Sequence, residues 1–147
     1  MDRFDERILC ELKSNGKLTN VELADRVGLS PSATLRRVQE LERQNVLVGY
    51  RAVLNKQKIG IGFIAYVAVG LSNHSRKSQQ EFEIAISAAQ AVVECHNITG
   101  TSEYLLRVET HDLPAYKRFH AEILGESPHV SSITTMVVMD SVKDERG

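Results

Sequence analysis

The stretch that decides the fold is residues 19–37, which read TNVELADRVGLSPSATLRR. Thr19 followed by Glu22 is a capping box, in which each side chain satisfies a backbone amide of the other residue. Gly28 is a typical helix stop, and Ser30-Pro31 provides an N-cap hydroxyl followed by a proline suited to the first helical position. Two helices joined by so short a turn predict a helix-turn-helix.

The second of these helices is expected to enter the major groove of DNA. Leu35, Val38 and Leu41 recur every three residues, which predicts the buried face and leaves the polar side chains mainly outside. Guanidinium groups bind guanine or phosphate, hydroxyls bond base edges, and the free amides of a helix N-terminus suit a phosphate. The expected DNA contacts are Ser30, Ser32, Thr34, Arg36 and Arg37, with backbone contacts from Arg43 and Arg51.

The overall charge gives this prediction little support. Lys and Arg number 18 against 19 Asp and Glu, so the net charge is −1 and no broad basic field marks a nucleic-acid partner. Bundles of three helices also serve as protein-docking modules, and an Arg-Arg pair is usually only a solvated face. The Gly-x-Ser-Pro turn together with the outward Ser, Thr and Arg set favours DNA.

The flanking residues complete an N-terminal domain. Phe4, Ile8, Leu9 and Leu12 share one face of a first helix, which Asn15-Gly16 ends. The apolar residues 46–54 are expected to form a short hairpin or strand pair, a wing beside the helices. We therefore expect a winged helix-turn-helix domain over residues 1–54 and, because of its two glycines, a hinge over 55–62.

From residue 63 the apolar period changes to two. Strands are predicted over residues 63–71, 92–99, 104–110 and 130–139. Helices are predicted from a capping box at Ser78–Glu81 and from Asp112 as N-cap. The order βαββαβ predicts a ferredoxin-like domain over residues 63–147, so the fold class is α+β.

The first of these strands predicts assembly. The side chains on both faces of this strand are apolar, yet two helices cover only one face of a four-stranded sheet. A second copy is the simplest cover for the other face, and a dimer would hold two reading helices about 34 Å apart. We therefore expect double-stranded DNA with a palindromic operator as the partner.

Several function classes lack their signals. No apolar run approaches the roughly 18–20 residues of a membrane span, and the N-terminus does not resemble a signal peptide, so a cytoplasmic protein is expected. Cys10 and Cys95 stand alone, and the five histidines have no metal-ligand spacing. With neither a Walker loop nor a Gly-x-Ser-x-Gly motif, we expect no metal, no cofactor and no enzyme.

The whole chain resembles the Lrp/AsnC (feast/famine) family of prokaryotic transcription regulators. The stretches that carry the resemblance are DRFDERIL at 2–9, VELADRVGLSPS at 21–32, RRVQELE at 36–42, GYRA at 49–52 and VVECHNITG at 92–100. The resemblance implies an N-terminal winged DNA reader. It also implies an ACT-like (RAM) C-terminal domain that dimerises, assembles to a tetramer or octamer and binds small effectors, commonly amino acids.

In that family the effector lies near the turn between the second and third strands, which usually reads Gly-Asp-x-Asp-Tyr. Here the turn is GTSEY at 100–104, so Thr101 replaces the first acid and Glu103 keeps the second with one more carbon. Exposed amides and hydroxyls could hold a carboxylate, and Glu103 could pair with an ammonium group. The expected effector residues are Ile98, Thr99, Gly100, Thr101, Ser102, Glu103 and Tyr104, with Thr135 and Met136 from the last strand.

Two alternatives remain open on the sequence. Haem-pathway enzymes of the sirohaem decarboxylase type resemble this family, although the intact Ser-Pro-Ser and Arg-Arg reading helix argues against that class. An architectural DNA-packing protein without an effector is the other.

Overall fold

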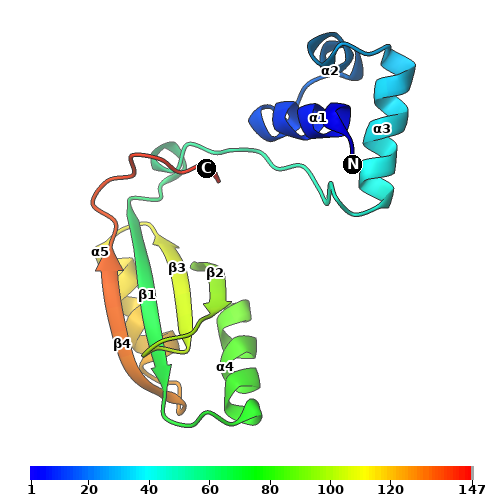
Figure 1. Ribbon diagram of the computed structural model, residues 1–147. Coiled ribbons are helices and arrows are strands. Elements are labelled where there is room, and N and C mark those ends of the chain that lie inside the picture. Colours follow the sequence, from blue (N-terminus) through cyan, green and yellow to red (C-terminus); the bar gives the residue numbers. More distant parts are fainter. Residues whose placement is uncertain (147) are drawn as a thin grey trace. The chain divides into compact units, whose positions relative to one another are not determined.

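The computed structural model describes residues 1–146, which belong to two compact units (Figure 1). The first unit runs from Met1 to Val53, and the second begins at Leu54. Each unit has its own hydrophobic core and is described by itself.

The first unit consists of three helices, α1 (Arg3–Ser14), α2 (Asn20–Val27) and α3 (Pro31–Arg43). The predicted caps of α2 and α3 are confirmed. The Thr19 amide donates to Glu22 Oε2 at 2.8 Å, and the Ala33 amide donates to Ser30 Oγ at 3.2 Å. Gly28 ends α2 with a φ of +78°, a left-handed conformation that favours glycine. Local chemistry thus fixes the turn between the two helices.

The predicted inner face of α3 is confirmed at Val38 and Leu41 and wrong at Leu35. Thr34 is completely buried, whereas Leu35 is 45% exposed. Thr34 Oγ1 donates to the Ser30 carbonyl at 3.0 Å, so its hydroxyl is satisfied within its own helix and its methyl group can enter the core. The core of this unit is formed by Ile8, Leu12, Leu23, Val27 and Leu41.

The hairpin or strand pair predicted over residues 46–54 is wrong, because these residues form no strand. The amides of Val46 and Leu47 instead donate to the Leu41 carbonyl at 2.9 and 3.1 Å, which closes the end of α3. The stretch that follows is extended and leaves Val48 86% and Val53 73% exposed. A two-residue hairpin turn that starts at a glycine needs a positive φ at that residue, and Gly49 does not adopt one.

The second unit is a four-stranded antiparallel sheet with two helices. Its strands are β1 (Phe63–Leu71), β2 (Val92–Asn97), β3 (Tyr104–Thr110) and β4 (Val130–Val137), in the order β2-β3-β1-β4. The helices α4 (Arg76–Ala88) and α5 (Leu113–Phe119, continued by a π-helical turn His120–Leu124) cover one face (Figure 1). A short 3-10 helix, Gln57–Ile59, precedes the sheet. The predicted ferredoxin-like fold is confirmed.

This unit differs from the prediction at one helix start and at two strand ends, since β2 ends at Asn97 instead of Thr99 and β4 ends at Val137 instead of Met139. Ser75, not Ser78, caps α4, since Ser75 Oγ accepts from the Ser78 amide at 3.2 Å. Ser78 is itself buried, and Glu81 pairs with His129 instead of closing a capping box. The core lies between the helices and the face of β1 that carries Ala65, Val67 and Val69.

Candidate DNA-binding and effector sites

The outer side of α3 presents Arg36 and Ser32. Both side chains are exposed, and among residues 1–146 Arg36 takes part in no hydrogen bond or ion pair. Ser30, at the start of the helix, is also exposed, and its hydroxyl lies 3.3 Å from that of Ser32. The first two turns of α3 therefore offer one guanidinium, two hydroxyls and a helix N-terminus to a ligand such as DNA.

Arg37 does not share this exposure. Its Nη1 atom donates to both carboxylate oxygens of Asp2 and to Asp5 Oδ1, each at 2.9 Å, and its guanidinium lies 5.3 Å from the centre of the Phe4 ring. Hydrogen bonds to Asp5 and then Asp2 raise the pKa of Arg37. The sequence pattern missed these two partners, which belong to the start of α1.

The remaining predicted DNA residues divide in the same way. Thr34 is buried in the helix core, so it presents no surface to a ligand in this conformation. Arg43 is exposed but forms a two-pronged ion pair with Glu40, at 2.8 and 2.6 Å. Arg51 is exposed in the extended segment that follows α3.

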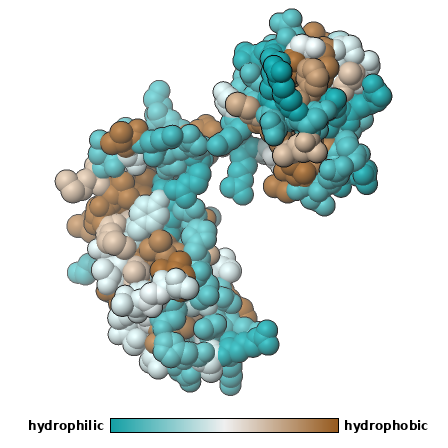
Figure 2. All heavy atoms as spheres, in the orientation of Figure 1, coloured by the Kyte–Doolittle hydropathy of each residue, from teal (hydrophilic) through white to brown (hydrophobic). Residues whose placement is uncertain are grey.

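In the second unit, the face of the sheet opposite the helices is uncovered. Its residues from β1 and β4 include Ile64, Tyr66, Ala68 and Met136, and Met136 is 46% exposed. Figure 2 shows hydrophobic residues gathered over β1 and β4 on this face.

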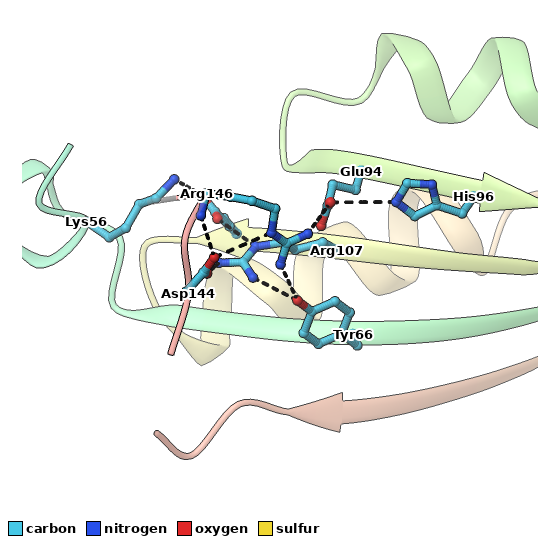
Figure 3. A network of polar contacts seen from close by, with 8 residues as sticks. Lys56, Tyr66, Glu94, His96, Arg107, Asp144 and Arg146 are labelled. Atoms are coloured by element: carbon cyan, nitrogen blue, oxygen red, sulfur yellow. Dashed lines mark hydrogen bonds and ion pairs between the residues drawn. The ribbon is translucent and has the colours of Figure 1, made fainter. Parts of the chain in front are cut away.

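Beside this apolar area lies a network of charged side chains (Figure 3). Arg107 Nη1 donates to Tyr66 Oη at 2.8 Å, and its other nitrogens pair with Glu109 at 3.1 Å and Asp144 at 3.2 Å. Burial alone would lower the pKa of Arg107, but the hydrogen bonds to Tyr66 and Glu109 raise it. Arg146 extends the network by donating to Tyr66 Oη at 2.9 Å and by pairing with Glu94.

The turn between β2 and β3 is the predicted effector site. Gly100 has a φ of +119° and, like Thr99 and Thr101, is exposed; Ile98 is 37% exposed and Ser102 is half-buried. Glu103 already has partners, since its carboxylate accepts from the Leu71 amide at 2.7 Å and lies 2.9 Å from His74 Nδ1. An ammonium group would therefore have to compete with His74.

The other predicted effector residues are not all brought to this turn. Tyr104 is 1% exposed, and its hydroxyl donates to Glu83 of α4 at 2.9 Å. The pKa of the Tyr104 phenol is raised mainly by burial and to a smaller extent by the hydrogen bond to Glu83. Thr135 and Met136 lie on β4, at the opposite edge of the sheet from β2, and they point to opposite faces, Thr135 toward Tyr116 of α5. Within one protomer, Thr135 and Met136 do not join the turn.

Known proteins match both units. The sequence model of the Lrp/AsnC ligand binding domain matches residues 64–147, and that of a winged helix-turn-helix DNA-binding domain matches residues 1–48. The chain belongs to the Lrp/AsnC family of transcription regulators. As a member of this family it is an effector-modulated, DNA-binding transcriptional regulator.

Individual Lrp/AsnC relatives resemble nearly the whole chain. A proline dehydrogenase transcriptional activator of Rhizobium radiobacter is 40% identical over 144 residues, covering 98% of this chain and 92% of that protein. A leucine-responsive regulatory protein of Escherichia coli K12 is 38% identical over 143 residues, covering 97% and 87%. A Neisseria meningitidis transcriptional regulator, solved in complex with L-Met, has a TM-score of 0.94 at 31% identity, covering 98% and 93%.

Within residues 1–146, none of the helices combines the length and the apolar character that crossing a bilayer requires.

Sequence reasoning missed the charged network on the open sheet face. A signal was present, because Arg107 and Glu109 alternate with buried apolar residues along β3. Two charges on one side of an otherwise apolar strand indicate a face with its own polar partners. The partners Asp144 and Arg146 lie beyond β4, where no periodic pattern marks them.

Proposed function

We propose that this regulator recognises a specific DNA sequence through Arg36 and Ser32 at base edges. The start of α3 at Ser30, together with Arg43 and Arg51, would contact phosphates and set the position of the helix. The single observation that carries the proposal is that Arg36 projects, exposed and without an ion-pair partner among the described residues, from a helix that begins directly after a tight turn.

We propose further that a second copy covers the open face of the sheet. The half-exposed residues of β1 and the exposed Met136 support a homodimer, which would then assemble further to a tetramer or octamer. Two reading helices in fixed positions would require an operator with two-fold symmetry. Residues 1–54 would be the reader, 55–62 the hinge and 63–147 the regulatory domain.

The proposed effector is an amino acid bound at the β2–β3 turn. The exposed residues Thr99 to Thr101 and the half-buried Ser102 offer amides and hydroxyls to a carboxylate, and relatives are named for leucine response or solved with L-Met. Titrating L-amino acids into the protein–DNA complex tests this. Thr101→Ala should shift the titration curve without changing the dimer, whereas Ser87→Ala on the outside of α4 should not. If no amino acid alters DNA affinity, the effector belongs to another chemical class.

The DNA proposal is tested with Arg36→Ala and a charge-matched control, Lys58→Ala, in the second unit. Operators are first selected from random sequences, and affinity is then measured at several salt concentrations. Arg36→Ala should weaken binding at least about tenfold and flatten the base preference at one position of each half-site. Lys58→Ala should bind like the parent. Unchanged binding by Arg36→Ala would contradict the reading-helix assignment.

A further inference from the structure

Arg37 lies one residue from Arg36 on α3, but its surroundings differ completely. Successive residues of a helix point about 100° apart, so the two guanidinium groups leave α3 in different directions. Arg36 points to the outside, whereas Arg37 points to the start of α1, where it meets three carboxylate oxygens at 2.9 Å. Its side chain is 31% exposed, and that of Asp5 is only 16% exposed.

The carboxylates that hold Arg37 are the same ones that cap α1. Asp2 Oδ1 accepts from the amides of Phe4 at 2.9 Å and Asp5 at 3.1 Å, while Asp5 Oδ2 accepts from the Asp2 amide at 3.0 Å. Each carboxylate therefore binds both the first turn of α1 and the guanidinium of α3. The Phe4 ring beside the guanidinium adds a cation–π contact at 5.3 Å. The side chains of α1 and its cap thus fix one side chain of α3.

This arrangement also changes what Arg37 offers to DNA. Two carboxylates offset its single positive charge, so a phosphate that approached Arg37 would meet net negative charge at short range. Arg36 has no such neighbours among residues 1–146. A contact between Arg37 and DNA would require breaking bonds that hold α1 to α3.

From these contacts we propose that Arg37 is a positioning residue that locks the start of α1 to α3 and so sets the orientation of the reading helix. It does not itself contact bases or phosphates. The part of the proposal that concerns DNA rests on the proposed function of Arg36, whereas the lock itself is a property of the first unit alone.

The lock is tested by a double-mutant cycle on the full chain with Arg37→Ala, Asp5→Asn and the double variant. Each single variant should lower the midpoint of thermal unfolding of the first unit by about 2–6 °C. The double variant should be less destabilised than the sum of the two single variants, because the bond between Arg37 and Asp5 is lost in each of them. Arg37→Lys, which keeps the charge but not the planar group, should recover part of the loss. Additive midpoint shifts would overturn the lock.

DNA titrations distinguish positioning from contact. Arg37→Ala and Asp5→Asn should both weaken binding about two- to fivefold, by the same factor for the operator and for its single-base variants, and both should keep the parent's salt dependence. If Arg37 instead contacted DNA, Asp5→Asn would free its guanidinium and tighten binding. Arg37→Ala would then lower the slope of the salt dependence by about one, or would flatten the preference for one base. That result would make Arg37 a DNA contact and refute the proposal.

The same titration includes Arg36→Ala, which separates the two claims. If Arg36→Ala binds DNA like the parent, Arg36 is not the reading residue. The double-mutant cycle of thermal midpoints then still tests whether Arg37 locks α1 to α3. If Arg36→Ala weakens binding but the thermal shifts are additive, the reading residue stands and the lock is wrong.

Discussion

Replacing Met136 with lysine tests how the regulator assembles. Met136 lies in β4 opposite Tyr66, on the sheet face that the helices leave open, and it is 46% exposed in a single protomer. If a second copy covers this face, dimerisation buries the rest of the side chain. A lysine there would place an ammonium group in the interface, where losing its water costs free energy.

The size of the effect follows from the exposed fraction. Complete burial of a methionine contributes about 1.5–3 kcal/mol, so burial of the 46% that is exposed contributes about 0.7–1.4 kcal/mol. A two-fold interface contains the residue twice, which gives about 1.4–2.8 kcal/mol and raises the dimer Kd about 10- to 100-fold. The lysine charge adds to this loss, so these values are the lower part of the expected range.

Sedimentation equilibrium over a range of protein concentrations measures this Kd. Val21→Lys is the matched control, because it introduces the same charge at a position of α2 in the other unit, where Val21 is 66% exposed. It should dimerise like the parent. An unchanged Kd for Met136→Lys would show that this face of the sheet is not the dimer interface.

Three further predictions test local features. Thr34→Val keeps the shape of a buried side chain but loses the hydrogen bond to Ser30, so it should cost about 1 kcal/mol in urea unfolding and leave DNA affinity unchanged. A Cβ atom on Gly62 would lie 2.8 Å from the His111 carbonyl oxygen, so Gly62→Ala should cost about 1–3 kcal/mol in the same assay. The hydrogen bond from the Asp5 amide, and to a smaller extent Arg37, lower the pKa of Asp2 in the folded protein. The ionised Asp2 carboxylate therefore stabilises the fold fully at pH values above its ordinary pKa of 3.8. This stabilisation is lost as the pH falls through the lower pKa of the folded state. Thermal midpoints of the parent and Asp2→Asn should therefore converge between about pH 5 and about pH 2.

The sequence predicted those features that depend on a few neighbouring residues. The capping box at Thr19, the stop at Gly28 and the Ser30 cap all act within one helical turn, so the helix-turn-helix follows from them directly. The alternating pattern of β1 and β3 predicted both strands with the bounds found in the structure, because side chains of a strand point alternately to its two faces.

The features that failed depend on contacts between elements. Leu35 and Thr34 compete for the inside of α3, and which one is buried depends on how α2 packs against that helix, which a pattern within α3 does not contain. Arg36 and Arg37 are identical residues side by side, and their surroundings differ because Arg37 faces Asp2, Phe4 and Asp5 at the start of α1. The strand pair over residues 46–54 was predicted from apolar residues alone, and it is not formed because Gly49 does not adopt the positive φ of a hairpin turn.

The open sheet face must be suitable for a partner in charge as well as in shape. Burying an unpaired charge is costly, and a dimer interface that covered Arg107 alone would lose much of what its apolar residues gain. The charged network avoids this cost, because its three positive and three negative groups are already paired within one protomer. The positive groups are Lys56, Arg107 and Arg146, and the negative groups are Glu94, Glu109 and Asp144. A second copy could therefore cover the face without having to supply a counter-charge. Its own apolar strip over β1 and β4 would then be sufficient, which is why a single substitution such as Met136→Lys, outside the network, is expected to have so large an effect on assembly.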